Sequence, residues 1–370
     1  MKFDAVIVGA GFAGAVIAEC LATEQNKKVA IIDKAPHIGG HCYDMYDENG
    51  ILIHKYGPHI FHTNYKPVWD YLNSFTDFSV YHHRVLGVIE GKKVPIPFNL
   101  DTLHTLFPTR TAQRIEDKLV EEFGFDKKVP ILKLRQTTDK DLTDLAEYVY
   151  NNIFKFYTKK QWGLSPEDLS PEVTGRVPVY ISHDDRYFQD TYQGLPTRGY
   201  THIFGNMLSH PNITQILNTD YKDIIKSLSY DLFVYTGPID YFFDYSYGPL
   251  KYRTLDFESI HYSTEWAQEV GTVNYPNNYN FTRITEYKHL TGQKADTTAV
   301  MREYPRNCET DVDEPYYPMF TEEWKTLYEK YKSEANKQKN TIFLGRLAEY
   351  KYYNMDAVIH AALKIYNTLK

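Results

Sequence analysis

A glycine-rich turn close to the N-terminus constrains the fold of this chain more than any other feature. The segment reads DAVIVGAGFAGAVIAECLA: a β-branched run, then Gly9, Gly11 and Gly14, then small and apolar residues at helical spacing. A second apolar run, KVAIID, ends at Asp33, about 20 residues after Gly14. At this spacing an acidic side chain accepts hydrogen bonds from an adenosine ribose while the helix N-terminus faces a pyrophosphate. The segment predicts a βαβ unit that binds a dinucleotide.

Two later segments favour FAD over NAD as that dinucleotide. DKAPHIGGHCY places a second glycine pair, Gly39 and Gly40, shortly after the second predicted strand, and it resembles the extended FAD signature of glutathione-reductase-type flavoproteins. YDLFVYTGPID, from Tyr230 to Asp240, resembles the strand and Thr-Gly turn with which that superfamily returns to its cofactor. We therefore predict an α/β fold with an FAD-binding Rossmann-like domain.

In such folds the last strand and the last helix also return to the cofactor domain. TIFLGRLAEY is the predicted last strand, and a helix is predicted to begin at about Met355. This arrangement places Arg346 near the pyrophosphate. The alternative is that Arg346 is a surface cation beside Glu349.

The rest of the chain predicts a discontinuous domain organisation. Apolar residues at helical spacing predict a helical insert, whereas YHHRVLGVIEGKKVPIPF predicts a hairpin that turns at Glu90-Gly91-Lys92. Strand-like runs predict an antiparallel sheet: YRTLDFESIHY, GTVNYPN, FTRITEYKH and TTAVMREYP. The predicted domains are an FAD-binding α/β domain at 1–80 with 200–240 and 340–370, a helical domain at 98–178, and an antiparallel β-sheet domain at 81–97, 179–199 and 241–320.

Composition narrows the class of function. The net charge is −7, so no nucleic-acid-binding surface is indicated, and an anionic ligand must be met by a few local arginines. Three scattered cysteines argue against a disulfide framework or a metal site, and no metal is expected. No signal peptide or membrane-length apolar run is recognisable, which predicts a cytoplasmic protein with no membrane partner. The 33 tyrosines suit a sugar or nucleotide site, which uses both the ring and the hydroxyl.

A series of sequence blocks carries a more specific resemblance. In chain order they are HKYGPHIFHTN, YTKKQWG, GRVPV, FTRITEYKH, EYP, DEPYYP and GRLAEYKYYNMD, which run from His54 to Asp356. The series resembles the bacterial UDP-galactopyranose mutases, and several of its blocks are uncommon outside them. The resemblance implies a flavoenzyme with an FAD-binding domain, a helical domain and an antiparallel sheet domain.

The resemblance also implies a reaction, the interconversion of UDP-α-D-galactopyranose and UDP-α-D-galactofuranose for cell-surface polysaccharide. Ring contraction requires an open sugar, which cannot form while the anomeric carbon is held in a glycosyl phosphate. In the implied mechanism N5 of reduced FAD attacks that carbon, UDP leaves and later returns, and no net redox change occurs. An external reductant such as NAD(P)H and a homodimer are further expectations.

Carried onto this sequence, the resemblance assigns the substrate site. Arginines are expected at the pyrophosphate because a planar, permanent cation stabilises a diphosphate leaving group. Tyrosine hydroxyls are expected to donate to the phosphates, aromatic rings to hold the uridine, and a segment from Gly163 to about Tyr187 to act as a lid. The catalytic candidates are Arg176, Arg283 and His62; the substrate-binding candidates are Tyr157, Thr158, Trp162, Arg176, Tyr187, Arg283, Tyr317 and Tyr352.

The cofactor-binding candidates come from the glycine motifs, the PHIFH segment, the Thr-Gly turn after Tyr235 and the C-terminal segment. They are Gly9, Gly11, Phe12, Gly14, Asp33, Lys34, Gly40, His41, His59, Ile60, Thr236, Arg346, Tyr352 and Met355. Simpler structural roles stay open for some candidates. Arg176 fits a surface charge, Trp162 fits a core aromatic, and His59 and His62 fit buried histidines with satisfied hydrogen bonds.

Two other functions are compatible with an FAD scaffold. An FAD-dependent oxidoreductase of the amine-oxidase type would oxidise its substrate and pass electrons to oxygen or another acceptor. A non-catalytic FAD protein that binds a nucleotide sugar is the other alternative. The paired Arg176 and Arg283 with a tyrosine-rich cleft favour a pyrophosphate ligand over an amine. Acceptance of N-acetylated sugars stays open.

One position departs from the pattern of the family. Its members usually carry an aspartate directly after the KYY tyrosines, whereas this chain has Asn354, with Asp356 two places later. Either side chain can accept a hydrogen bond from an early backbone N–H of the last helix. We predict that Asn354 is mainly a helix cap.

Overall fold

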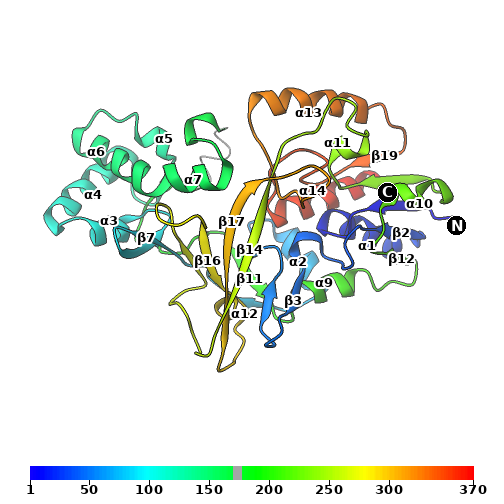
Figure 1. Cartoon of the computed structure of the whole chain (residues 1–370), viewed down its shortest axis with the longest axis horizontal. Coiled ribbons are helices and arrows are strands. Elements are labelled where there is room, and N and C mark those ends of the chain that lie inside the picture. Colours follow the sequence, from blue (N-terminus) through cyan, green and yellow to red (C-terminus); the bar gives the residue numbers. More distant parts are fainter. Residues whose placement is uncertain (170–176) are drawn as a thin grey trace. The chain divides into compact units, whose positions relative to one another are not determined.

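The computed structural model describes residues 1–169 and 177–370 (Figure 1). The chain forms two compact units. The first comprises Met1–Tyr81, Asp190–Thr254 and Cys308–Lys370, and the second comprises His82–Gln189 and Leu255–Asn307. The sequence predicts three domains, whereas the helical insert and most of the antiparallel sheet fall into one unit.

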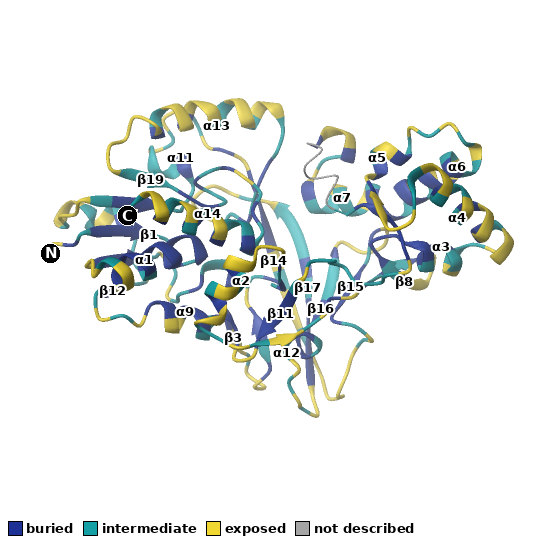
Figure 2. Ribbon diagram, turned by 180° about the vertical axis from the view of Figure 1, so that it is seen from behind, coloured by how far each residue is buried: buried dark blue, intermediate teal, exposed yellow. Residues whose placement is uncertain are grey.

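A parallel sheet forms the centre of the first unit. Its five strands have the order β12-β2-β1-β13-β19, and every neighbouring pair is parallel. The central strands β1, β2 and β13 are apolar throughout and largely buried, as expected where helices or loops cover both faces (Figure 2). The strands are β1 (Ala5–Val8), β2 (Val29–Ile32), β12 (Ile213–Ile216), β13 (Leu232–Tyr235) and β19 (Thr341–Phe343). The predicted Rossmann-like fold is confirmed.

Helices of the first unit pack on this sheet. The helix after the glycine turn, α1, carries small and apolar side chains on nearly all of its faces. It shares one hydrophobic core with α14 and α9. By contrast α13 has a largely exposed outer face (Figure 2). The helices are α1 (Phe12–Gln25), η1 (Gly40–Cys42), α2 (Lys66–Asn73), α9 (Tyr200–Met207), α10 (Tyr221–Ile224), η4 (Ile225–Ser227), α11 (Ile239–Phe242), α13 (Glu322–Ala335) and α14 (Met355–Thr368).

Short antiparallel pairs complete the first unit. One sheet has the order β5-β11-β6, and β3 pairs with β4. The short strand β18 pairs with the first residues of β14, since Tyr317 lies opposite Arg253. The strands are β3 (Asp44–Tyr46), β4 (Leu52–His54), β5 (Phe61–Thr63), β6 (Phe78–Val80), β11 (Tyr192–Pro196) and β18 (Tyr317–Pro318).

The second unit contains a mixed sheet in the order β14-β17-β16-β15-β7-β8. The predicted hairpin is confirmed, because β7 and β8 are joined by Glu90 and Gly91, which both have positive φ (51° and 79°). The run predicted as a strand from Phe281 to His289 is one only between Arg283 and Glu286, after which a short helix begins. The strands are β7 (Val85–Ile89), β8 (Lys92–Ile96), β14 (Tyr252–Tyr262), β15 (Thr272–Asn274), β16 (Arg283–Glu286) and β17 (Thr298–Asn307).

The helical insert packs on β7 and β8. Side chains from these two strands and from α3, α4, α5, α6 and η2 share a single hydrophobic cluster, which explains why helices and sheet form one unit. Asn99 and Asp139 cap α3 and α6 by accepting hydrogen bonds from the first turn. The other elements of the second unit are α3 (Leu100–Leu106), α4 (Thr109–Phe123), β9 (Lys127–Val129), α5 (Ile131–Leu134), α6 (Lys140–Val149), η2 (a π-helix, Tyr150–Phe154), α7 (Lys155–Trp162), η3 (Pro166–Asp168), β10 (Val179–Ile181) and, after β16, α12 (Tyr287–Thr291).

None of the helices within the described part of the chain combines the length and apolar character needed to span a membrane.

Candidate functional site

The turn after β1 brings the backbone of three segments together. Gly9 has a φ of 103°, and a Cβ added there would lie 1.9 Å from Oγ1 of Thr236. A Cβ added at Gly14 would lie 2.0 Å from the carbonyl oxygen of Gly9. Gly11 is the N-cap of α1, and no side chain caps this helix end. The N-terminus of α1 therefore has the close backbone approach and the N–H groups that suit a pyrophosphate.

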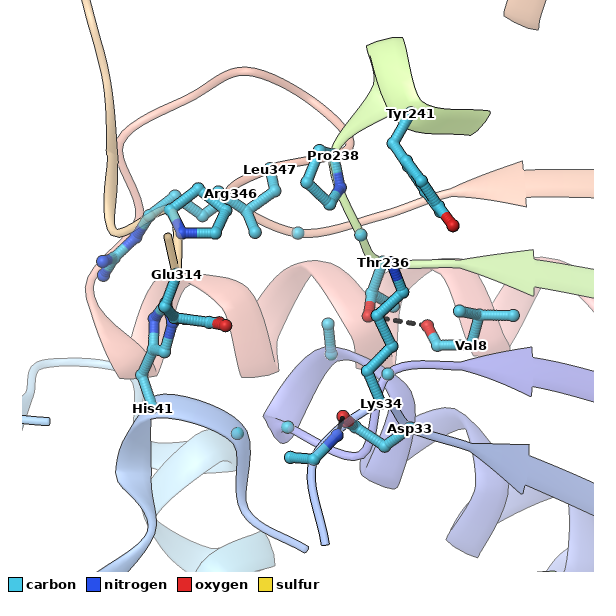
Figure 3. Close-up of a pocket in the computed structure, with 18 of the residues that line it drawn as sticks. Val8, Asp33, Lys34, His41, Thr236, Pro238, Tyr241, Glu314, Arg346 and Leu347 are labelled. Carbon is cyan, nitrogen blue, oxygen red and sulfur yellow. Dashed lines mark hydrogen bonds and ion pairs between the residues drawn. The ribbon is translucent and has the colours of Figure 1, made fainter. Parts of the chain in front are cut away.

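A cavity of about 580 Å³ lies at this turn, within the first unit (Figure 3). Its wall is built from the glycine turn, the segments that follow β2 and β13, the loop before β18, and the segment between β19 and α14. The volume is in the range of cofactor sites. The sequence-predicted residues that line the cavity are Gly9, Gly11, Phe12, Asp33, Lys34, Gly40, His41, His59, Thr236, Arg346 and Met355.

Asp33 links the glycine turn to the segment that follows β2. Its carboxylate oxygens accept hydrogen bonds from the backbone N–H of Ala10 (2.7 Å) and of Ala35 (2.8 Å). Burial raises the pKa of Asp33, and these two bonds oppose the rise. Each carboxylate oxygen keeps a further lone pair, so Asp33 can also accept from ribose hydroxyls in the cavity.

Lys34 has a different setting, because it belongs to a charged cluster at the edge of the cavity. Its Nζ lies 2.9 Å from Oδ2 of Asp220 and 3.9 Å from the ring centroid of Tyr241. The hydroxyl of Tyr241 donates to the same carboxylate. Figure 3 shows Lys34 and Tyr241 on one side of the cavity, with Asp33 below them.

His41 and Glu314 form a pair that the sequence analysis did not find. Nε2 of His41 lies 2.9 Å from Oε1 of Glu314, and Figure 3 shows the two side chains next to each other. The imidazole also stacks on Tyr316, with ring centroids 4.6 Å apart. Burial acts to raise the pKa of Glu314, but the hydrogen bond and charge of His41 outweigh it and lower the pKa. The sequence signal was the DEPYYP block, which contains both Glu314 and Tyr316.

Arg346 is held by backbone carbonyls and aromatic rings. Its Nη1 donates to the carbonyl oxygen of Tyr316 (3.1 Å) and its Nη2 to that of Tyr353 (2.8 Å). The guanidinium carbon lies 5.2 Å and 5.4 Å from the ring centroids of Tyr317 and Tyr352, which are parallel to within 1°. Arg346 thus lines the cavity, and the alternative of a surface cation beside Glu349 does not fit these contacts. Arg346, Tyr317 and Tyr352 form one cluster.

The histidines of the PHIFH segment differ in their surroundings. His59 lines the cavity, and burial lowers its pKa to about 3. Its backbone N–H donates to Nδ1 of His54 (3.0 Å), which is also buried and also has a lowered pKa. Both imidazoles are therefore neutral at neutral pH. Ile60 is nearly buried, at 9% exposure.

His62 contacts a carboxylate away from the described lining of the cavity. Its Nδ1 lies 2.9 Å from Oδ2 of Asp190, whose other oxygen accepts from Nδ2 of Asn64 at 2.6 Å. Such a pairing fixes the ring and its tautomer, as it does in catalytic histidines. Asp190 carried no motif of its own and was missed by the sequence analysis.

The substrate candidates of the second unit lie on two elements. Tyr157, Thr158 and Trp162 all belong to α7, with Trp162 buried at its end. Arg283 begins β16, and its Nε donates to Oε1 of Glu303 at 2.7 Å.

Two further candidates of this unit belong to the predicted lid. Tyr187 packs beside the helical core, and its ring meets His83 and Phe188 edge-on. Arg176 lies outside the described residues, as do residues 170–175 of the same segment.

Asn354 occupies the predicted position but does not act as predicted. It is the N-cap residue of α14, yet its side chain makes no capping hydrogen bond. The backbone N–H of Ala357 instead donates to Oδ1 of Asp356 at 2.7 Å, and Oδ2 of Asp356 accepts from the hydroxyl of Thr63 at 3.0 Å. The side-chain capping role assigned to Asn354 is therefore wrong, because the neighbouring aspartate serves the helix end.

Within residues 1–169 and 177–370, no group of three or more histidine, cysteine or acidic side chains is placed to hold a metal ion.

Comparisons with known proteins identify the family to which this chain belongs. A family described as "UDP-galactopyranose mutase" matches residues 152–352, and a family described as "NAD(P)-binding Rossmann-like domain" matches residues 7–75. The chain belongs to the UDP-galactopyranose mutase family. It is therefore an enzyme, an isomerase. This membership favours the predicted mutase over an oxidoreductase of the amine-oxidase type.

Individual relatives match nearly the whole chain. The dTDP-fucopyranose mutase of Escherichia coli is 37% identical over 97% of this chain and 96% of its own length. The UDP-galactopyranose mutase of Mycoplasma pneumoniae is 35% identical over 98% of this chain and 95% of its own length. A crystal structure of reduced UDP-galactopyranose mutase has a TM-score of 0.76 at 16% identity, covering 100% of this chain and 94% of that one, and it supports the fold. Family and fold together indicate a flavin cofactor.

Proposed function

We propose that this enzyme interconverts UDP-galactopyranose and UDP-galactofuranose with FAD in its reduced form. One observation carries the proposal: a cavity built for a dinucleotide lies in a chain that matches a UDP-galactopyranose mutase over 98% of its residues. An external reductant such as NAD(P)H and a homodimer remain predictions.

The residues present fit FAD. The bare N-terminus of α1 and Arg346 would hold the pyrophosphate, and Asp33 would accept from the adenosine ribose. Gly9 packs so closely against Thr236 that a β-carbon there would force these two segments of the cavity wall apart. When bound and reduced, the flavin supplies a nucleophilic nitrogen for the anomeric carbon. His59 lines the cavity and is neutral, so it would add no charge beside a flavin bound there.

Other side chains of the protein would bind the nucleotide sugar. Tyr157, Thr158 and Trp162 on α7 would hold the uridine. Arg283 and Arg176 would bind the diphosphate and stabilise it as a leaving group, since guanidinium groups stay charged and match phosphate geometry. Hydroxyl groups from the tyrosines would donate to the same phosphates: Tyr187, Tyr317 and Tyr352.

His62 would act as a proton carrier for the sugar hydroxyls. The contact of Nδ1 with Asp190 would fix the orientation of the ring for this role.

A second substrate is favoured by a specific observation. The dTDP-fucopyranose mutase of Escherichia coli matches this chain at 37% identity, close to the value for the UDP-galactopyranose mutase of Mycoplasma pneumoniae. The two substrates differ by a methyl group on the base and by two hydroxyl groups, one on the ribose of the nucleotide and one on C6 of the hexose. The same ring contraction would apply to both.

A substrate panel tests the proposal. Purified enzyme with FAD and dithionite is incubated with UDP-galactopyranose and, separately, with dTDP-fucopyranose, and furanose products are identified by chromatography and NMR. We expect UDP-galactofuranose from the first reaction at the higher kcat/KM. Product from dTDP-fucopyranose alone would move the assignment to the second substrate, and no furanose from either would refute both.

A further inference from the structure

A lysine on α7 reaches into the loop that leads to Arg283. The loop joins β15 to β16, covers residues 275–282, and ends where Asn274 and Arg283 lie opposite each other in the sheet. Nζ of Lys160 donates to the carbonyl oxygen of Phe281 at 3.0 Å and to that of Tyr275. The carbonyl oxygens of Asn278 and Tyr279 lie 3.4 Å from the same nitrogen. The ammonium therefore sits where the loop carbonyls converge, as a bound cation would.

The loop has features that make such a cation useful. Tyr279 has a φ of 67°, a left-handed conformation that is unfavourable for a bulky side chain. Converging carbonyl dipoles also repel one another unless a positive group lies between them. Both costs are offset when the ammonium holds the loop closed. A second tether runs from Nδ2 of Asn277 to the carbonyl oxygen of Asn152 at 2.8 Å.

Keeping this charge has a cost for the folded protein. Burial lowers the pKa of Lys160 to about 8 from a value near 10.5 in the unfolded chain. The unfolded chain therefore binds the proton more tightly, and the free energy of unfolding rises as the pH increases from about 8 to about 10.5. At neutral pH the charge destabilises the fold. A destabilising charge of this kind is typical of a functional position.

The location of Lys160 gives that function. It lies one turn after Tyr157 on α7, the helix that carries the uridine candidates, and its loop leads directly into Arg283. Building on the proposed function, we propose that Lys160 is a positioning residue that fixes the nucleotide-binding face of α7 relative to Arg283. Uridine and diphosphate are then recognised at a set distance from each other.

Binding of the nucleotide tests this role without turnover. The FAD-loaded enzyme and its variants are titrated with UDP and with dTDP, followed by calorimetry. Lys160→Met should weaken binding about tenfold or more while the FAD content stays normal, and Lys160→Arg should recover most of the loss. Lys159→Met is the matched control, because Lys159 is an exposed lysine on the same helix, and it should bind like wild type. Binding by Lys160→Met within twofold of wild type would overturn the proposal.

A double-mutant cycle separates positioning from a general structural effect. If Lys160 acts through Arg283, adding Lys160→Met to Arg283→Ala should weaken binding less than twofold further. Independent losses that multiply would contradict the role. If Lys160→Met yields no FAD-loaded protein, Asn277→Ala removes the other tether and should weaken binding about threefold. Unchanged binding in that variant would also count against the proposal.

This test and the substrate panel can fail separately. If the wild-type enzyme makes no furanose and Lys160→Met still weakens nucleotide binding, the mutase proposal is refuted and the positioning role is kept. If the wild-type enzyme forms furanose and Lys160→Met binds the nucleotide as wild type does, the mutase proposal is kept and the positioning role is refuted.

Discussion

Nε of Arg283 donates to Oε1 of Glu303 at 2.7 Å, and the two residues lie opposite each other on neighbouring strands, β16 and β17. Glu303 is 1% exposed, so this carboxylate is fixed within the sheet. A bond through Nε sets the plane of the guanidinium and hence the direction of its two terminal nitrogens. The sheet thus presents Arg283 in one orientation, as the proposed diphosphate site would require.

Removal of the Arg283 side chain should impair the reaction without loss of cofactor. We expect Arg283→Ala to lower kcat/KM roughly a hundredfold or more, because a charge-assisted contact to the leaving group is lost. Arg176→Ala should behave in the same way. The controls are Arg302→Ala and Arg306→Ala, whose side chains pair with Glu258 and Asp256. Similar kinetics for all four variants would refute the assignment.

The glycine turn should not tolerate a β-carbon. Gly14→Ala places that carbon 2.0 Å from the carbonyl oxygen of Gly9, so α1 must move away from β1. We expect loss of bound FAD, measured by visible flavin absorbance. Gly205→Ala is the matched control, because its β-carbon meets nothing within 4 Å, and it should stabilise α9 by about 0.5–1 kcal/mol. FAD binding by Gly14→Ala like that of wild type would show that the turn is more adaptable than its packing indicates.

Acid should destabilise the protein through its buried histidines. The pKa of His59 is about 3 in the folded state, against about 6.5 in the unfolded chain. Between these values only the unfolded chain binds the proton, so the free energy of unfolding falls as the pH is lowered from about 6.5. His54 acts in the same direction.

Urea denaturation across this pH range measures the effect. His59→Gln should show a shallower fall of the unfolding free energy than wild type, whereas the exposed His360→Gln should follow wild type. Equal slopes in all three proteins would contradict a neutral, buried His59.

The contact between Thr63 and Asp356 should stabilise the junction of β5 with α14. Thr63→Val keeps the shape of the side chain but leaves a buried carboxylate oxygen without its hydroxyl donor, at a cost of about 1–3 kcal/mol. Thr63→Ser keeps the donor and should lose less. Chemical denaturation compares the two variants, and equal stability of Thr63→Val and wild type would show that the hydrogen bond contributes nothing net.

Much of the fold was predictable because its signals are local. The β-branched run before Gly9 and the alternating run from Tyr252 to Tyr262 are strands, and the last helix begins at Met355 as predicted. Strand periodicity failed at Tyr287, where apolar and polar residues alternate but a helical turn forms. There a buried carboxylate, Glu286, accepts hydrogen bonds from another loop, a tertiary contact that overrides the local pattern.

The contacts within the candidate site were less predictable than its residues. The sequence motifs named His41 and Arg283 as candidates but did not pair them with Glu314 and Glu303, which stand in the DEPYYP and EYP blocks. The first pair is separated by 273 residues, so only the folded chain brings it together. Lys160 stands in a named block, yet a lysine beside an exposed lysine on a helix gives no sign that loop carbonyls surround it. The site around Lys160 is built from backbone carbonyls, which every residue has and which therefore leave no signal in the sequence.

Redox dependence tests the central claim most directly. The initial rate of furanose formation from UDP-galactopyranose is measured with one enzyme preparation, first oxidised under air and then reduced anaerobically with dithionite. If the reduced cofactor supplies the nucleophile, the reduced enzyme should be at least about a hundredfold faster, while both forms bind UDP. Equal rates in the two states would contradict the account.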